Sequence, residues 1–357
     1  MTNGRWEPPV IDYRPADPQR LDLAIGLIGC GNITRDHLAA YRQAGYRVTA
    51  LCDIDRAAAE RRRDEFFPAA AVDKRYPDLL ARADVNVVDI ATHAEIRAEI
   101  IEAALLAGKH VLSQKPFVLD LEVGRRLVSM ADRGGLKLAV NQNARWAPHF
   151  SYLRQAVLCG LIGKIQAVHC GVHWDHNWVA GTTFDDMRHV ILFDFAIHWF
   201  DIMQCLMKGE LPQSVLATTV RSPTQTARQA LLAQALVQYQ HAQGSLVFDG
   251  NTRHGRRDTT VVVGEHGTLY SSGPDGNRQQ VTLCRGDYEL QPQLEGHWFP
   301  DGFHGTMGEL LRAIEEDRSP SNSAAANLDS LAVCFAAVAS ADRGGPVVPG
   351  DVRAVPE

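Results

Sequence analysis

The stretch LAIGLIGCGNITRDH, residues 23–37, decides the fold class. Its first half is almost entirely apolar, which is typical of a strand buried on both faces of a sheet. Gly29 and Gly31 follow at once, and residues 33–44 then have a helical pattern that ends at Gly45. A strand, a glycine-rich turn and a helix in this order form a dinucleotide-binding fingerprint.

The turn and the next strand carry the groups that a dinucleotide needs. Gly29 permits the tight turn, and Gly31 allows a pyrophosphate to approach the backbone. The helix start presents the amides of Asn32 and Ile33 to that pyrophosphate. Asp53 ends the next strand, 24 residues after Gly29. Because a carboxylate there accepts hydrogen bonds from ribose hydroxyls and repels a 2′-phosphate, the sequence predicts NAD as the cofactor, with NADP second.

Apolar runs and helical patterns alternate through the first part of the chain. We expect strands at residues 23–29, 46–53, 85–92, 109–113 and 136–140, with helices between them. Strands this apolar predict a parallel sheet that helices cover on both faces. From Pro148 the pattern changes to a helix, a long polar and aromatic strand, several short strands and two closing helices. The sequence therefore predicts an α/β chain with an N-terminal Rossmann domain at 22–147 and a C-terminal α+β domain at 148–357, whose open sheet is mainly antiparallel.

Residues 1–21 are rich in proline and lie before the first strand. Proline has no amide donor and holds the chain extended, so we expect an arm that is disordered or that packs on a neighbouring subunit. The arm contains no continuous apolar core like that of a signal peptide.

Charge and composition exclude several classes of partner. The net charge of −6, the pI of about 6.2 and the scattered Lys and Arg leave no basic face for nucleic acid. We expect no run long enough to span a membrane, and so no membrane partner. The seven cysteines are odd in number and contain no C-x-x-C pair, which predicts reduced thiols in a cytoplasmic protein and no metal site.

The helical segment DFAIHWFD, residues 194–201, places Asp194, His198 and Asp201 on one face of a helix. A carboxylate one turn before a histidine orients the imidazole and stabilises its protonated form, as for a general base that acts on a hydroxyl. The alternative is an aspartate that caps the helix and a histidine with a structural role. The segment alone leaves both interpretations open.

A second histidine-rich segment, HCGVHWDHNW at residues 169–178, has the alternation of a strand. One face carries His169, His173, Asp175 and Asn177, and the other carries Trp174, His176 and Trp178. We expect His173, Asp175 and Trp178 to line a pocket for a sugar-like substrate, through hydrogen bonds and aromatic stacking. The alternatives are a packed or solvated strand, and a zinc site, against which the wide spacing and the missing thiolate pair argue.

Polar side chains follow two of the expected strands, at the edge where open α/β sheets bind ligands. Thr92 ends the third expected strand, and Gln142 follows the fifth within AVNQNARWAP, residues 139–148. We expect both to contact the cofactor, and Arg145 and Trp146 to contact the substrate. The alternative is that these residues only form the hinge between the domains.

Five motifs follow one another along the chain: GLIGCGNITRDHL, ALCDID, VDIAT, AGKHVLSQKP and DFAIHWFD. From about residue 22 to residue 349 the chain resembles the glucose-fructose oxidoreductase and inositol dehydrogenase family (Gfo/Idh/MocA), whose members are mostly NAD(P)-dependent sugar and polyol oxidoreductases. The resemblance implies an NAD-dependent dehydrogenase that acts on a monosaccharide or cyclitol. It also implies a homodimer or homotetramer formed through the C-terminal sheet.

The resemblance assigns roles to individual residues. The family's Glu-Lys-Pro corresponds to Gln114, Lys115 and Pro116, and its Asp-x-x-x-His helix corresponds to Asp194 and His198. Lys115, Asp194 and His198 are then the catalytic group and contact the substrate. Gln114 and Lys115 also border the cofactor. A cis peptide bond before Pro116 is a further expectation from the resemblance.

This catalytic group suits the removal of hydride from a carbon that bears a hydroxyl. Because hydride leaves only as the hydroxyl loses its proton, the site needs a base and a positive group near the developing alkoxide. His198 is expected as the base, oriented by Asp194, and Lys115 as the positive group, although the lysine and the histidine could exchange these roles.

The chain departs from the family pattern at two places. Gln114 replaces a glutamate, which removes a negative charge that would favour the protonated form of Lys115. In ATHAEIR, residues 91–97, His93 stands in place of a proline and Arg97 in place of a histidine.

Two other functions are compatible with the same fold, because fold alone does not determine function. A sugar- or nucleotide-sensing regulator would bind its ligand without catalysis, and it would not need the lysine, aspartate and histidine that this chain keeps. An NAD-dependent glycoside hydrolase would regenerate its cofactor within each turnover, so that NADH would not accumulate.

Overall fold

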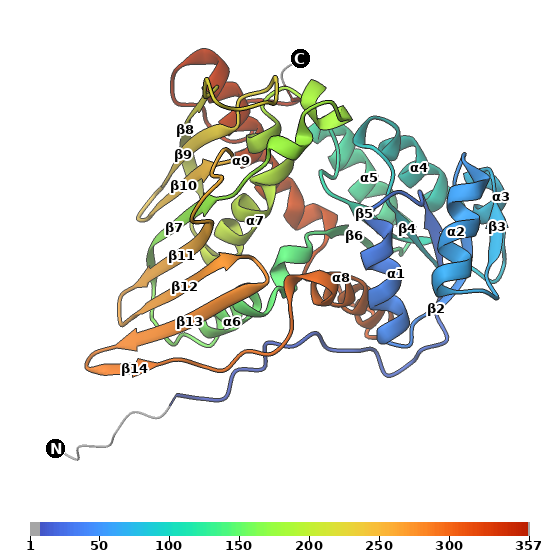
Figure 1. The fold of residues 1–357 in the computed structure, drawn as a ribbon. Coiled ribbons are helices and arrows are strands. Elements are labelled where there is room, and N and C mark those ends of the chain that lie inside the picture. The colour runs from blue at the N-terminus through green and yellow to red at the C-terminus, as the bar shows by residue number, and fades with distance from the viewer. Residues whose placement is uncertain (1–7, 356–357) are drawn as a thin grey trace.

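The computed structural model describes residues 8–355, which form two sheets (Figure 1). The first sheet has six parallel strands in the order β3-β2-β1-β4-β5-β6. Its strands are β1 (Ala24–Ile28), β2 (Arg47–Cys52), β3 (Ala71–Asp73), β4 (Val87–Ile90), β5 (His110–Gln114) and β6 (Leu138–Asn141). Its helices are α1 (Thr34–Gln43), α2 (Arg56–Phe66), α3 (Tyr76–Leu80), α4 (Ala94–Leu106) and α5 (Leu121–Arg133). The predicted doubly wound Rossmann arrangement is confirmed.

The strand order of this sheet reverses beside β1, so the ligand-binding crevice lies at the carboxyl ends of β1 and β4. The sequence analysis missed β3 and α3, which lie at the far edge of the sheet. β3 has three residues, all half-buried, and therefore lacks an apolar run that could reveal it. As a consequence, Lys115 follows the fifth strand and not the fourth.

The second sheet has eight strands in the order β14-β13-β12-β11-β7-β10-β9-β8. Neighbouring strands are antiparallel, except that β7 and β10 are parallel. The strands are β7 (Ile165–His173), β8 (Pro212–Val220), β9 (Leu232–Tyr239), β10 (Gln243–Asp249), β11 (Arg257–Gly264), β12 (Thr268–Asp275), β13 (Arg278–Arg285) and β14 (Tyr288–Leu290). The α-helices after β6 are α6 (Pro148–Leu158), α7 (Ile197–Leu206), α8 (Trp298–Glu315) and α9 (Ala324–Arg343). The prediction of an open, mainly antiparallel sheet is confirmed.

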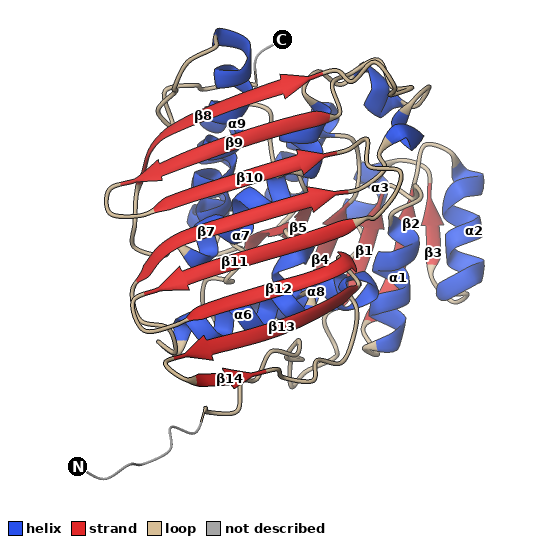
Figure 2. Cartoon of the chain, turned by 60° about the vertical axis from the view of Figure 1, so that its left-hand side comes forward, coloured by secondary structure: helices blue, strands red, loops and turns tan. Residues whose placement is uncertain are grey.

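The two faces of the second sheet differ in their surroundings. Along β9, Ala233 and Val237 are buried, whereas Leu236 between them is 58% exposed. Helices α6, α7 and α9 lie behind the buried face, and Figure 2 shows the other face turned towards the viewer. Nothing in the described part of the chain covers that outer face.

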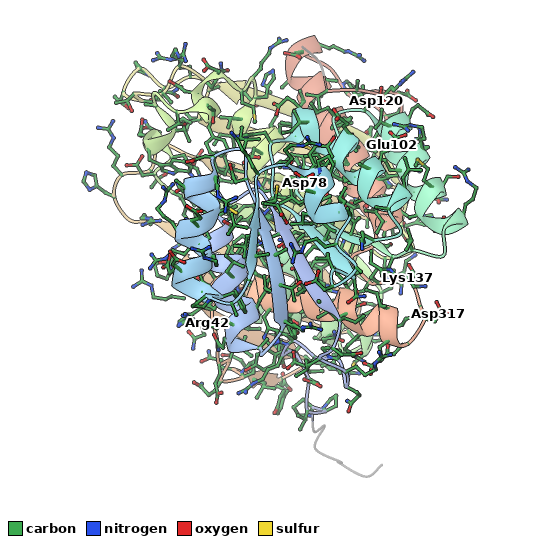
Figure 3. All side chains as sticks on the ribbon, turned by 90° about the vertical axis from the view of Figure 1, so that its right-hand side faces the viewer. Arg42, Asp78, Glu102, Asp120, Lys137 and Asp317 are labelled. Carbon is green, nitrogen blue, oxygen red and sulfur yellow. The ribbon has the colours of Figure 1, made fainter. Side chains whose placement is uncertain are left out.

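Helix α8 packs on the first domain although it lies late in the sequence. Its Phe303 and Met307 share a core with Leu27 of β1. Figure 3 shows Lys137 and Asp317 next to one another, and their Nζ–Oδ1 distance of 2.8 Å links the start of β6 to the end of α8. The predicted boundary between the domains therefore does not separate the two cores, because the chain returns to the Rossmann sheet.

The described part of the proline-rich arm packs on its own chain. Ser151 of α6 donates a hydrogen bond of 2.6 Å to the carbonyl oxygen of Tyr13. Asp17 lies 2.6 Å from the Tyr46 hydroxyl and 2.6 Å from Nε2 of His304 in α8. The arm therefore touches both domains as it runs along one edge of the molecule (Figure 1), an arrangement that was not among the expectations. Residues 1–7 of the arm lie outside the described residues.

Helix α9 corrects the expectation that no run is long enough to span a membrane. Its 20 residues have a mean hydropathy of 1.5 over the most apolar window, so length and composition alone would suffice. In the fold, 67% of that window is buried, and the helix packs against α7 and β8. α9 is a core helix of this chain.

Candidate active site

The glycine-rich turn after β1 has the geometry that the fingerprint requires. Gly29 has a φ of 90°, and a Cβ there would lie 2.8 Å from the carbonyl oxygen of Ala91, so only glycine fits. A Cβ on Gly31 would meet no atom within 4 Å, which leaves the backbone open to a ligand. Asn32 and Ile33 lie at the start of α1, which has no side-chain cap, whereas aspartates cap α2 and α5. The uncapped positive end of α1 therefore fits a pyrophosphate.

Asp53 lies at the end of β2, beside this turn. Its two carboxylate oxygens accept hydrogen bonds from the backbone amides of Cys30, at 2.7 Å, and Asp55, at 2.8 Å. Each oxygen keeps a lone pair with which it can bind a ribose hydroxyl. Arg56, the nearby cation that could have bound a phosphate, is instead paired with Glu60 at 2.9 Å.

Ile54 is a cofactor-binding candidate that the sequence analysis missed. It follows Asp53 directly and is 87% exposed, which is unusual for a large apolar side chain. This position suits contact with the flat face of an adenine ring. The signal in the sequence is an isoleucine between two aspartates in ALCDID, where a loop residue would be polar.

Lys115 follows β5 at the same edge of the sheet, and its peptide bond to Pro116 is cis. Its Nζ lies 2.9 Å from Oδ2 of Asp194 and 2.9 Å from the carbonyl oxygen of the same residue. Asp194 belongs to a π-helical turn, Ile191–Phe195, that precedes α7. A π-helical turn takes more residues than an α-helical one, so side chains four residues apart no longer align. The Asp194 carboxylate therefore binds Lys115, and not His198 as the sequence predicted.

His198 is the second buried group of the site, with 9% of its surface exposed. Its Nδ1 has no hydrogen-bond partner within the described chain, and its ring lies edge-on to Trp298 at 5.4 Å between centroids. Burial lowers the pKa of His198 well below its ordinary value, and the positive charge of Lys115 lowers it further. His198 is therefore neutral at neutral pH and able to accept a proton.

Two predicted cofactor contacts have polar atoms that no protein group satisfies. Oγ1 of Thr92 and both Nε2 and Oε1 of Gln142 are buried and lack a hydrogen-bond partner within residues 8–355. Buried polar atoms are normally hydrogen-bonded, so these atoms are suited to a ligand. The two residues follow β4 and β6, at the edge where the glycine-rich turn and Lys115 also lie. Since a nicotinamide carboxamide is both a donor and an acceptor, this edge fits the predicted cofactor.

Gln114 binds the protein interior. Its Oε1 accepts a hydrogen bond of 2.8 Å from the backbone amide of Lys115, and its Nε2 lies 3.2 Å from Nε2 of His37. Nδ1 of His37 in turn lies 2.7 Å from Asp89. A glutamine Nε2 can only donate, so it donates to Nε2 of His37. The Gln114 side chain is thus committed to His37, which leaves it out of the proposed cofactor contacts.

Arg145 and Trp146 are not part of the site that the structure assembles. Arg145 is 3% exposed and forms a bidentate ion pair with Asp201, with both N···O distances at 2.6 Å. Trp146 is buried, with the guanidinium of Arg154 over its ring at 5.5 Å. Asp201 is likewise turned into the core, because it is the counter-ion of Arg145. The predicted substrate contacts of Arg145 and Trp146 are therefore replaced by packing roles.

The residues after β7 are arranged differently from the expected long strand. The strand ends at His173, and a 3-10 turn, Asn177–Val179, follows. On the outer face of the sheet, Nδ1 of His173 lies 2.9 Å from Asp249, and Asp175 binds the side chain of Asn177 at 2.7 Å. We therefore leave His173 and Asp175 out of the proposed substrate wall, because their polar atoms bind neighbouring residues of the chain.

The opposite side of this segment faces the site. The ring of Trp174 packs on Trp199 of α7 at 5.5 Å, and that of His176 packs on Phe195 at 4.5 Å. Trp178, predicted to contact the substrate, is 54% exposed, and its ring lies 5.8 Å from that of Phe195. The rings of His176 and Trp178 thus pack around Phe195, the residue that follows Asp194 in the chain.

Two family models match the chain. The model described as "Oxidoreductase family, NAD-binding Rossmann fold" matches residues 23–142. The model of the GFO/IDH/MocA C-terminal domain matches residues 150–270. Together they account for the whole first sheet and most of the second, so the prediction of an NAD-binding Rossmann domain in an oxidoreductase is confirmed.

Known proteins resemble the chain over most of its length. It is 27% identical to D-apiose dehydrogenase of Paraburkholderia graminis, over 90% of this chain and 88% of that one. It is 28% identical to inositol 2-dehydrogenase of Rhizobium meliloti, over 90% and 97%. The solved oxidoreductase of Agrobacterium radiobacter, in complex with NAD+, L-tartaric acid and magnesium, has the same fold, with a TM-score of 0.82, 22% identity and coverage of 92% and 99%. The chain therefore belongs to the Gfo/Idh/MocA family of NAD(P)-dependent oxidoreductases, as its motifs predict.

Proposed function

We propose that this protein is an NAD-dependent dehydrogenase that oxidises a hydroxyl-bearing carbon of a monosaccharide or cyclitol. The observation that carries the proposal is the ion pair of Lys115 and Asp194 next to the neutral His198, at the ligand-binding edge of an NAD-binding sheet. Two relatives are named for D-apiose and inositol, which supports a polyhydroxylated substrate. The exposed ring of Trp178 suits the apolar face of such a molecule.

The three side chains divide the reaction between them. His198 accepts the hydroxyl proton, since its imidazole is neutral. Lys115 donates a hydrogen bond to the same oxygen as negative charge develops there, which stabilises the alkoxide-like transition state. Asp194 holds the Lys115 ammonium in place through its carboxylate and its carbonyl oxygen. A bound NAD would supply the hydride acceptor, held by the glycine-rich turn, Asp53, Thr92 and Gln142.

The burial of His198 predicts an unusual pH profile. Because its pKa lies well below the ordinary value of 6.5, the imidazole stays unprotonated, and competent as a base, as the pH falls through 6.5. We expect the acid limb of kcat/KM to lie below the ordinary histidine value of 6.5, and His198→Gln to remove both this limb and most of the activity. A wild-type acid limb at the pKa of an ordinary histidine would contradict a buried histidine base.

The assay that tests the proposed function is a panel of aldoses, cyclitols and trans-dihydrodiols, followed by NADH absorbance with NAD and, in parallel, with NADP. Reduction of NAD by at least one polyol supports a dehydrogenase. Binding of sugar or NAD without turnover of any compound favours the sensing regulator, and turnover of a glycoside without net NADH favours the hydrolase. Activity with NADP alone would overturn the role of Asp53 as the residue that rejects a 2′-phosphate.

We also propose that the outer face of the second sheet pairs with a second copy of the chain. Leu216 is 42% exposed, Leu236 58% and Tyr270 44%, and all three lie on strands of this face. Exposed apolar side chains on a broad sheet are suited to an interface. Light scattering should give the mass of a dimer or tetramer for the wild type and a smaller mass for Leu236→Glu. A monomeric wild type would contradict the proposal.

A further inference from the structure

Arg97, in the first turn of α4, is buried beneath the segment that carries Lys115. Only 3% of its surface is exposed. Its Nη1 donates to the carbonyl oxygen of Gln114 at 2.9 Å and also to that of Pro116. Its Nε donates to the carbonyl oxygen of Thr92 at 3.1 Å, and its Nη2 binds the same oxygen. One guanidinium therefore binds the residues on both sides of Lys115 and the segment that follows β4.

The contacts of Arg97 are carbonyl oxygens, and none of the ion pairs in the described part of the chain includes it. Burial lowers the pKa of Arg97 to about 10, although the carboxylates of Asp194 and Glu95 act in the opposite direction. The guanidinium therefore stays charged at neutral pH. A buried charge without a counter-ion in contact is costly, so its persistence here depends on the carbonyl dipoles that face it.

The segment at Lys115 is also held by the Gln114 side chain. The backbone amide of Lys115 donates to Oε1 of Gln114, whose amide group is bound to His37. The position of the Lys115 ammonium thus depends on a short backbone segment that Arg97 and Gln114 both fix. These are the two places where the chain departs from the family pattern in charge, and the structure brings them into direct contact.

Charged and titratable groups reach Lys115 from several elements. They are Asp194 of the π-helical turn, His198 of α7 and the buried thiol of Cys334 in α9. Arg97 adds a fixed positive charge to this set. This charge attracts the carboxylate of Asp194, which is the counter-ion of Lys115.

We propose that Arg97 is a positioning residue for Lys115, because its guanidinium holds the backbone at residues 114–116 on both sides of the lysine. The inference rests on the proposed dehydrogenase function. The imidazole that the family resemblance places at this position has at most two donors, so it could not bind three carbonyl oxygens in this way. A lysine would keep the charge but lacks the planar fork of donors.

Two substitutions separate the planar set of guanidinium donors from the positive charge. Arg97→Lys keeps the charge and loses the planar set of donors, whereas Arg97→Met loses both. We expect kcat to fall about 10- to 100-fold in both variants, because the reacting groups are displaced. We expect the KM for the polyol to stay within about threefold of the wild type, because Arg97 contacts neither ligand and acts only through the position of Lys115. Quenching of tryptophan fluorescence by NAD reports that each variant is folded.

Arg154→Met is the matched control. Arg154 is also a buried arginine that donates to a carbonyl oxygen, that of Arg145, at 2.7 Å. Within residues 8–355, none of the hydrogen bonds of Arg154 involves residues 114–116. Its replacement should lower the thermal midpoint and leave kcat within about threefold of the wild type. If methionine at position 97 prevents NAD binding, Arg97→Gln takes its place in the same comparison, since glutamine retains an amide donor.

Two results would overturn the proposal. One is an Arg97→Met variant with the kcat of the wild type. The other is an equal fall in kcat in Arg97→Met and Arg154→Met, because the loss would then follow from lost stability and Arg97 would have only a structural role. Failure of the proposed function gives a different result. In that case the wild-type protein itself reduces no NAD with any polyol, whereas failure of the Arg97 proposal requires an active wild type and equally active variants.

Discussion

Replacement of Lys115 by methionine is expected to lower kcat by about a thousandfold while NAD binding is kept. Methionine has a similar length but offers neither a charge nor a donor to the developing alkoxide. NAD binding should persist, because Lys115 contacts Asp194 and not the glycine-rich turn. Steady-state kinetics with an active polyol gives kcat, and quenching of tryptophan fluorescence gives the dissociation constant of NAD.

Lys109→Met is the matched control for this variant. Lys109 lies before the amino end of the same strand, and its Nζ donates to the carbonyl oxygens of Arg82, at 2.9 Å, and Val85, at 2.7 Å. It lies at the edge of the sheet opposite to Lys115, so its loss should leave the kcat of the folded protein within about twofold of the wild type. Equal activity of Lys115→Met and the wild type would remove Lys115 from the mechanism.

Replacement of Asp201 by leucine is expected to destabilise the fold by about 3–5 kcal/mol. The variant leaves the guanidinium of Arg145 buried without its counter-ion, and it also removes the acceptor of the Ser330 hydroxyl, at 2.9 Å. Arg145 follows β6 and Asp201 lies in α7, so this ion pair joins the end of the Rossmann sheet to the helix that carries His198. Urea unfolding followed by circular dichroism measures the loss of free energy.

Two comparisons show whether the buried charge is the cause. In the double variant Arg145→Leu/Asp201→Leu no charge is left unpaired, so a large part of the stability should return. Glu316→Gln removes the partly exposed partner of Arg312 and Arg318 and should change the free energy of unfolding by only about 1 kcal/mol. An Asp201→Leu variant as stable as the wild type would contradict the structural role given to this ion pair.

The architecture of the chain could be predicted because its signals are repeated and local. The central strand β1 is a continuous apolar run, and Gly29 after it has the backbone conformation and the close contact that the fingerprint implies. β3 was missed because three half-buried residues at an edge leave no pattern. The position of α8 was also missed, since no local signal shows that a helix returns to an earlier domain.

The partners of the site residues could be predicted only in part. Spacing places Asp194 and His198 one α-helical turn apart, but the π-helical turn gives the carboxylate to Lys115. Alternation along β7 separates the two faces correctly, yet it cannot say which face meets the helices, and so His173 was assigned to the wrong side. The counter-ion of Arg145 lies 56 residues away in the sequence, beyond the reach of any local pattern.

The role proposed for Arg97 has a signal in the sequence, but that signal could not be interpreted without the structure. Arg97 was visible in the sequence as a departure from the family pattern, as was Gln114. The sequence gives no reason to connect two residues on different elements, whereas in the structure Arg97 binds the carbonyl oxygen of Gln114. Departures from a family pattern are thus most informative when the structure brings them together.

The most direct test of the central claim follows a single hydrogen atom. A polyol that is active in the panel is deuterated at the carbon that becomes the carbonyl, and it is then oxidised by the wild-type protein with NAD. Mass spectrometry of the cofactor should show one deuterium in each NADH formed, with carbonyl product and NADH in equal amounts. NADH without deuterium, or product formed without any NADH, would contradict a dehydrogenase that acts through Lys115 and His198.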